Sequence, residues 1–258
     1  MGISGAAVAT GLGYSVTAVA GLFVFSRKKS LLHFTKPVCR FKVLAGAATN
    51  GCSEMATALV TGIITMMFNW TMLHYVGEDG VAAVTIIMYV LMFASSLYTG
   101  YSYGVAPMLS YYYGEQNHQK LKKLVATSLK VIACICLITG AASFMLTRPL
   151  VSVFARPDNP VYELAVTGNR ICTVALFFIG FNIFASGMFT ALSNGIVSAV
   201  LAFSRSFVFM LITMIVLPLL LGVNGIWLAT PAAELMALML SAFMFLTQTS
   251  HTDWSAEP

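Results

Sequence analysis

Long runs of apolar residues dominate this chain of 258 residues and limit what it can fold into. An α-helix needs about 20 apolar residues to cross a bilayer, and seven stretches reach that length. They are residues 3–25, 53–76, 81–103, 124–146, 164–190, 197–221 and 225–246. Because hydrocarbon offers no hydrogen-bond partner to a free backbone group, runs this long must be helical. We therefore predict an all-α polytopic membrane bundle of seven transmembrane helices.

The composition agrees with a membrane protein and argues against a soluble one. Hydrophobic residues make up 59% of the chain and charged residues only 9%, whereas about a quarter of the residues in a soluble domain are charged. A soluble enzyme or nucleic-acid-binding protein is therefore excluded, and the net charge of +5 is interpreted as a membrane orientation signal. The five cysteines and four histidines have no ligand-like spacing, so we predict no metal site, no disulfide framework and no cofactor.

Basic residues alternate between the two sides of the predicted bundle. Lys and Arg favour cytoplasmic loops, and the first, third and fifth connections hold or border most of them: Arg27, Lys28, Lys29, Lys36, Arg40, Lys42, Lys120, Lys122, Lys123 and Arg205. The alternate connections hold only Arg148 and Arg156. We therefore predict a multi-pass protein of the plasma (inner) membrane, with the N-terminus of this chain outside and its C-terminus in the cytoplasm.

The connection over residues 26–50 is the one extended loop that the sequence predicts. It is basic and partly amphipathic, and it separates the first span from the other six. The remaining connections are short, as expected for antiparallel neighbours in a compact bundle. Residues 26–50 therefore mark the only plausible domain boundary.

The second span carries a stripe of polar residues at helical spacing. Glu54, Thr57, Thr61, Thr65 and Asn69 are separated by three or four residues, which places them within roughly 120° of one helix face. Such a stripe is typical of the wall of a water-filled cavity. The alternative is a buried polar seam that joins helices through Thr and Asn hydrogen bonds, although a seam does not explain the carboxylate.

Two acids lie within predicted spans, Glu54 and Glu234. A charged residue in hydrocarbon costs at least a few kcal/mol, so an intramembrane acid is by default a functional candidate. Both are candidate ion-coupling residues. The alternatives are that Glu54 reaches the headgroup region, and that Glu234, just after Pro231, pairs with a neighbouring helix. Arg170, well inside a span, is expected to pair with a carboxylate or to extend toward the interface.

The fifth span combines polar and aromatic side chains. Together they would form a site for flat lipophilic cations through cation–π contacts, or they would serve core packing and interhelical hydrogen bonds. The residues are Asn182, Ser186 and Thr190, beside Phe177, Phe178, Phe181 and Phe184. With the stripe of the second span, Asn182 and Ser186 are our candidates for a substrate path.

Several short motifs resemble those of the multidrug and toxic compound extrusion (MATE) transporters. The strongest is "GEDGVAAVTIIMYVLMFASSLYTGYSYGVAPMLSYYYGEQNHQKLKKL" at residues 77–124, which includes a Gly loop, an Ala-Pro turn and a Tyr-Gly-Glu sequence. "GISGAAVAT" at 2–10 resembles the start of the family's sixth helix, and "NGCSEM" at 50–55 that of its seventh. "GVNGIWLATPAAE" at 222–234 is similar to the entry into its last helix. The order and spacing of these motifs make the resemblance fairly specific.

The resemblance implies two six-helix lobes, twelve helices in all. This chain would supply the last helix of the first lobe (1–25), the cytoplasmic linker (26–50), the second lobe (51–246) and a cytoplasmic tail (247–258), and would lack most of the first lobe. The implied function is efflux of lipophilic organic cations or drugs by alternating access, coupled to Na⁺ or H⁺. Glu54 matches an acid that some members carry in the seventh helix.

Other classes of protein remain as alternatives. A seven-helix retinal protein would need a Lys in its last span, which 225–246 lacks, and a signalling receptor would need a longer inner loop near its sixth helix. A lipid-linked oligosaccharide flippase of the same superfamily would be expected to line its cavity with several basic residues. The last alternative is a truncated half that is inactive without a partner lobe. No motif supports an enzyme, so we expect a secondary active transporter driven by an ion gradient.

Overall fold

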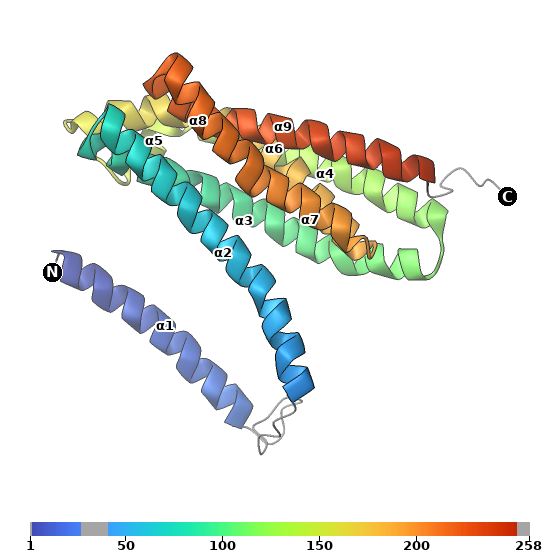
Figure 1. Cartoon of the computed structure of the whole chain (residues 1–258). Coiled ribbons are helices and arrows are strands. Elements are labelled where there is room, and N and C mark those ends of the chain that lie inside the picture. The colour runs from blue at the N-terminus through green and yellow to red at the C-terminus, as the bar shows by residue number, and fades with distance from the viewer. Residues whose placement is uncertain (1, 27–40, 252–258) are drawn as a thin grey trace. The chain divides into compact units, whose positions relative to one another are not determined.

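The computed structural model describes residues 2–26 and 41–251, and every regular element within them is helical. The chain divides into two compact units, Met1–Ser53 and Glu54–Pro258. Residues 27–40, which make up most of the predicted linker, and residues 252–258 of the predicted tail lie outside the described residues. The described elements confirm the prediction of an all-α bundle (Figure 1).

The first unit contains helix α1 (Gly2–Ser26) and the beginning of α2 (Phe41–Tyr75). Residues Ala7–Ser26 are long and apolar enough to cross a membrane. Large side chains such as Leu12 and Val19 are more than half exposed, as expected of a helix whose surface faces lipid. Helix α2 begins at Phe41, well before the start that hydropathy predicts at residue 53.

The second unit contains the remaining helices. After α2 come α3 (Glu78–Gly114), α4 (His118–Met145), the short α5 (Thr147–Ser152), α6 (Pro160–Ala191), α7 (Gly195–Phe203), the π-helix η1 (Ser204–Phe209), α8 (Met210–Leu221) and α9 (Val223–His251). The segment from α7 to α8 is a single membrane-length run, Gly195–Leu221, interrupted by η1. Six described helical segments are long and apolar enough to span a membrane, and α2, which is not among them, occupies the position predicted for the second span.

Short polar signals in the sequence set several helix starts. The side chains of Asn117, Asn159 and Asn194 accept hydrogen bonds from backbone N–H groups at the starts of α4, α6 and α7, which satisfies donors that a helix leaves without partners. Two tight turns use glycine: Gly77 has φ +92° before α3 and Gly222 has φ +58° before α9. Only glycine adopts these angles without strain.

Helix α6 lies at the centre of the second unit and packs against α3, α4 and α9. Close approach depends on glycine. A Cβ on Gly168 would collide with Ile87 and Trp227, and one on Gly180 with Cys136. Small residues at such crossings let membrane helices pack closely.

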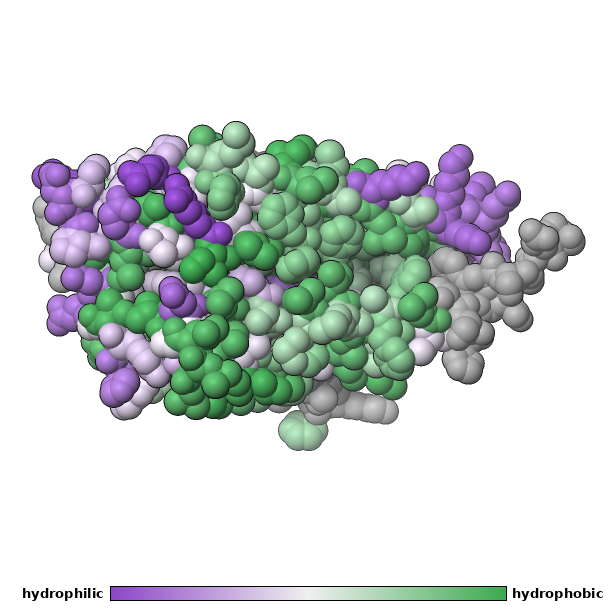
Figure 2. All heavy atoms as spheres, turned by 90° about the horizontal axis from the view of Figure 1, so that it is seen from above, coloured by the Kyte–Doolittle hydropathy of each residue, from purple (hydrophilic) through white to green (hydrophobic). Residues whose placement is uncertain are grey.

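The surface has the pattern of a membrane protein. In Figure 2 hydrophobic residues cover the middle of the visible face, and hydrophilic residues gather toward its two ends. Large apolar side chains are exposed on every long helix, among them Leu137 on α4 and Leu219 on α8. Exposed apolar area on this scale requires a non-aqueous surrounding or a partner.

Candidate functional site

A pocket of about 470 Å³ opens between α2, α3, η1 and α9. Its walls combine apolar side chains with a small number of polar and charged ones, the usual make-up of a small-molecule site. The lining residues are Val60, Thr61, Ile64, Thr65, Phe68, Asn69, Val84, Thr85, Met88, Tyr89, Met92, Arg205, Ser206, Met210, Thr230, Ala233 and Glu234. The described lining residues therefore come from α2 and from three candidate membrane spans, and all of them belong to the second unit.

The polar stripe of α2 lines this pocket along its described part. Thr61, Thr65 and Asn69 all belong to the wall, and the Thr65 hydroxyl donates to the Thr61 carbonyl at 2.9 Å. The side chains of Glu54 and Thr57 lie outside the described residues. The roles of all five residues in ion coupling or in a substrate path stay predictions.

Glu234 on α9 also lines this pocket, and a guanidinium binds it. Arg205 Nε donates to both Glu234 Oε1 and Oε2, at 2.9 Å each. The side chains of Glu234 and Arg205 are 10% and 23% exposed, so the ion pair is largely withdrawn from water. The structure thus places Glu234 in the pairing arrangement that we left as its alternative, and its role in ion coupling stays a prediction.

Asn182 on α6 donates two hydrogen bonds to Glu234. Its Nδ2 donates to Glu234 Oε2 at 2.8 Å and to the Glu234 backbone carbonyl at 2.9 Å, and its Oδ1 accepts from the Ser241 hydroxyl at 3.2 Å. Asn182, Glu234 and Ser241 are all buried. This network joins α6, η1 and α9, and it fixes the orientation of the carboxylate.

Ser186 and its neighbours serve helix packing in this structure. The Ser186 hydroxyl shares a hydrogen bond with the Ser198 hydroxyl at 3.1 Å, and the Thr190 hydroxyl shares one with Ser198 at 2.6 Å. Phe184 is buried and its ring lies 6.5 Å from that of Tyr101. Neither Asn182 nor Ser186 lines the pocket wall, and their place on a substrate path stays a prediction.

Arg205 is a residue of this site whose role the sequence analysis did not predict. We counted it at the border of a cytoplasmic connection, although the predicted span 197–221 contains it, and the structure places it in η1, inside the membrane-length segment Gly195–Leu221. The π-helix widens the backbone at this point, and such bulges often occur at functional sites. The sequence signal that could have identified Arg205 as a site residue is a basic residue in the middle of an apolar run. Arg170, by contrast, is exposed on α6, and its guanidinium carbon lies 6.0 Å from the centre of the Phe144 ring.

Thr230 is a second polar residue that sequence reasoning did not select. It lines the same pocket, four residues before Glu234 on α9, and is only 6% exposed. Its Oγ1 is buried without a hydrogen-bond partner. An unpaired buried hydroxyl is costly, and this one is close to the ion pair at the pocket wall.

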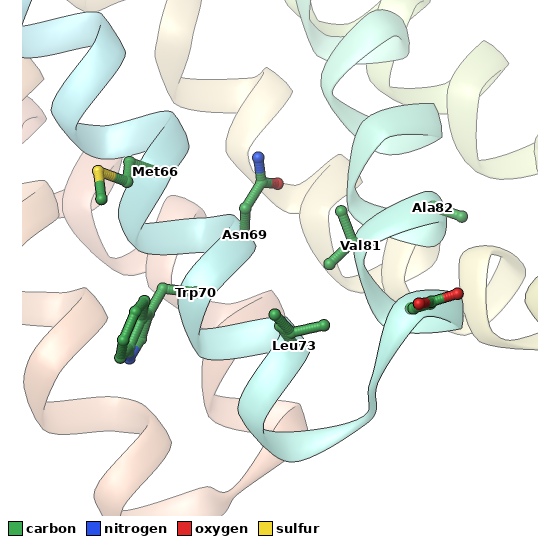
Figure 3. A pocket seen from close by; sticks show the side chains of 7 residues that line it. Met66, Asn69, Trp70, Leu73, Val81 and Ala82 are labelled. Atoms are coloured by element: carbon green, nitrogen blue, oxygen red, sulfur yellow. The ribbon is translucent and has the colours of Figure 1, made fainter.

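A second pocket of about 560 Å³ lies between α2 and the start of α3 (Figure 3). Asn69 lines both pockets and extends from α2 in the direction of α3. The remaining walls are mainly apolar and include Trp70 and Val81. Among the side chains that the structure describes, no group of three or more His, Cys, Asp or Glu residues is arranged to hold a metal ion.

The fold and the pocket define a polytopic helical membrane protein with a partly polar site inside its spans. Residues 55–216 match the family model MatE, and the chain belongs to this family. It is similar to the multidrug export protein MepA of Staphylococcus haemolyticus (strain JCSC1435), with 23% identity over 254 residues. That match covers 94% of this chain and 53% of MepA, so the chain spans about half the length of this curated relative.

Two solved structures show the same fold. An inward-facing conformation of a multidrug resistance MATE family transporter of the MOP superfamily matches with a TM-score of 0.85 and 21% identity, covering 98% of this chain and 60% of that one. An outward-facing conformation matches with a TM-score of 0.77 and 21% identity, covering 97% and 57%. The MatE match confirms the predicted family, whose members are transporters and not enzymes.

Proposed function

We propose that this chain is part of a multidrug efflux antiporter that exports lipophilic organic cations or drugs by alternating access. The proposal extends the family membership to an activity. The observation that carries it is the pocket of about 470 Å³ within the spans, which is large enough for a drug-sized molecule and combines apolar walls with polar residues.

The energy source that we propose is a gradient of Na⁺ or H⁺. Glu54 is the first candidate for the coupling acid, because it continues the polar stripe of Thr61, Thr65 and Asn69 along α2. Glu234 is the second candidate. Its bond to Arg205 neutralises its charge, so coupling through Glu234 would require the pair to open, whereas coupling through Glu54 would not.

The proposed setting is the plasma (inner) membrane, with the N-terminus of this chain outside and its C-terminus in the cytoplasm. Arg205 lies inside a span and drops out of the inside count, but Lys120, Lys122 and Lys123 support a cytoplasmic connection between α3 and α4. We also propose that the chain works beside a complementary first lobe, since family structures of this fold are longer than this chain.

Dye efflux from proteoliposomes tests the proposal. The full chain is reconstituted together with a complementary first lobe in liposomes that contain ethidium, and a Na⁺ or H⁺ gradient is applied separately. We expect dye movement with one gradient, its loss in Glu54→Gln, and normal movement in the matched control Glu115→Gln, which changes an exposed acid between α3 and α4. Normal efflux by Glu54→Gln would remove Glu54 from the mechanism, and dye movement that ignores both gradients would refute ion-coupled transport by this chain.

A further inference from the structure

We propose that an apolar pocket between α3, α4, α5 and α6 binds the hydrocarbon part of an amphiphilic cation whose charged end lies in the polar pocket. The apolar pocket has a volume of about 610 Å³, and the polar pocket is the one of about 470 Å³ described above. As a statement about a transport substrate, this inference rests on the proposed function. It adds a second subsite, and with it a preference for cations that carry a long alkyl or aromatic body.

The first argument is the composition of the walls of the apolar pocket. Apart from Tyr89, its polar lining residues are Thr139 and Ser143, and both of their hydroxyls are engaged within the protein. The Thr139 hydroxyl donates to the Ile135 carbonyl at 2.8 Å, and the Ser143 hydroxyl shares a hydrogen bond with the Thr173 hydroxyl at 3.0 Å. Because an unpaired polar group is costly in such surroundings, the pocket favours hydrocarbon.

The second argument is the accessibility of the apolar pocket from lipid. The lining residues Phe93 on α3 and Val153 just after α5 are 71% and 76% exposed, and α3, α4 and α6 are all candidate membrane spans. A molecule dissolved among lipid tails therefore reaches the pocket without crossing water. Because lipid tails are as apolar as the walls, the transfer itself contributes little free energy, and binding depends on shape and contact.

The third argument is the continuity between the apolar pocket and the polar pocket. Tyr89 and Met92 line both of them, and at a spacing of three residues they share one face of α3. Next to these two residues, α3 contributes Thr85 to the polar pocket and Phe93 to the apolar pocket. One elongated ligand can therefore contact both pockets across Tyr89 and Met92.

A stacked ring pair supports Tyr89 at the border between the two pockets. The rings of Tyr89 and Phe154 are parallel within 6°, and their centroids lie 6.0 Å apart, a normal distance for offset-stacked rings. Phe154 follows α5 and lines the apolar pocket, so the pair connects α3 with this segment. Because aromatic rings attract cationic centres, Tyr89 suits the place where the charged end of the ligand meets its hydrocarbon body.

Photolabelling in a bilayer tests the proposal. Two probes share a trimethylammonium head and a dodecyl chain, and each carries a diazirine, at the chain end in one and next to the head in the other. The full chain is irradiated with each probe in phosphatidylcholine nanodiscs, and mass spectrometry locates the adducts. We expect the chain-end probe to label residues 142–154 and the head probe to label residues 60–69 or 230–234. Excess dodecyltrimethylammonium without a diazirine should abolish both signals.

A substitution that fills the apolar pocket assigns the chain-end labelling to it. Ala142 lines the pocket and is half-buried, so the ring of Ala142→Phe would occupy ligand space and should lower this labelling about tenfold. The matched control is Ala141→Phe, the same change at an exposed neighbour that does not line the pocket, and it should leave the labelling unchanged. If Ala142→Phe does not fold, Leu97→Trp fills the pocket from α3 and should give the same loss.

Three outcomes would overturn the proposal. Chain-end labelling that does not saturate, or that persists in the filled variants, would show contact with the general lipid-facing surface. Equal labelling of residues 142–154 by a phosphatidylcholine with the same chain-end diazirine, lost in Ala142→Phe, would assign the pocket to lipid tails. Head labelling outside the polar pocket would separate the two pockets. Since these are binding measurements, a failure of ion-driven dye efflux would leave the labelling pattern intact, and the two proposals can fail separately.

Discussion

The ion pair between Arg205 and Glu234 makes a quantitative prediction about stability. Both carboxylate oxygens lie 2.9 Å from Arg205 Nε, and the two side chains are 23% and 10% exposed. When one partner of a buried ion pair is removed, the other remains as a poorly solvated charge, and the usual cost is 3–5 kcal/mol. We expect the two single replacements to differ, because the carboxylate is the more buried partner.

Arg205→Met should lower the free energy of unfolding by about 3 kcal/mol, at the lower end of that range, because Asn182 continues to donate to the stranded carboxylate. Glu234→Gln should cost about 1.5 kcal/mol, since the guanidinium borders the pocket and Gln can still accept from Nε. The double variant should lose only about 1.5 kcal/mol, less than Arg205→Met alone, because neither charge remains.

The assay is a double-mutant cycle measured by unfolding in mixed detergent micelles, with far-ultraviolet circular dichroism as the readout. The expected result is strong non-additivity, with the double variant more stable than Arg205→Met. Arg148→Gln and Glu163→Gln form the matched control cycle, because that pair is 59% and 64% exposed with 3.5 Å between its charged atoms, and its coupling should be below about 1 kcal/mol. Additive losses at Arg205 and Glu234 would refute the view that the pair is electrostatically isolated from water.

Two glycines give further predictions of stability, both measured by the same unfolding assay. Gly225→Ala should cost about 2 kcal/mol, because its Cβ would overlap the backbone of Leu217 and Pro218, which cannot move without moving α8; a change below about 0.5 kcal/mol would show that the turn can relax. Gly77→Ala should cost about 1–3 kcal/mol from the backbone alone, because φ +92° with ψ −159° is a region essentially restricted to glycine and nothing lies within 4 Å of the added Cβ. Gly100→Ala, at an equally open position without a positive φ, serves as the control.

Hydropathy predicted the number and order of the spans because the bilayer imposes a length on each apolar run. It did not predict where the helices end. Helix α3 continues to Gly114, beyond the predicted end at residue 103, through a stretch rich in Tyr and Ser and past Pro107. Hydropathy shows where the apolar run ends, whereas the backbone hydrogen bonds of the helix continue beyond that point into polar sequence. The start of α6, in contrast, was available from Asn159 and Pro160, which together form a common N-terminal signal.

The sequence predicted the α2 wall of the site but not Thr230 on α9, and each outcome has its own physical reason. The face shared by Thr61, Thr65 and Asn69 followed from helical periodicity, because a regular helix fixes the directions of its side chains. Thr230 carried no such pattern, since it is a single hydroxyl in an apolar helix and its importance arises from the absence of a partner for Oγ1. The absence of a hydrogen-bond partner for a hydroxyl depends on where the whole fold places the surrounding groups. The sequence therefore carries no signal of it.

The pairing of Arg205 with Glu234 could have been found from the sequence by comparing depths in the membrane. The tight turn at Gly222 makes α8 and α9 antiparallel neighbours. At a rise of 1.5 Å per residue, Arg205 lies about 25 Å back from that turn and Glu234 about 18 Å forward. The difference of about 7 Å is within the reach of an arginine side chain directed toward the turn. Two opposite charges at similar depth on adjacent spans cost far less together than apart, so each should be tested against the other before either is assigned to ion coupling or to a loop.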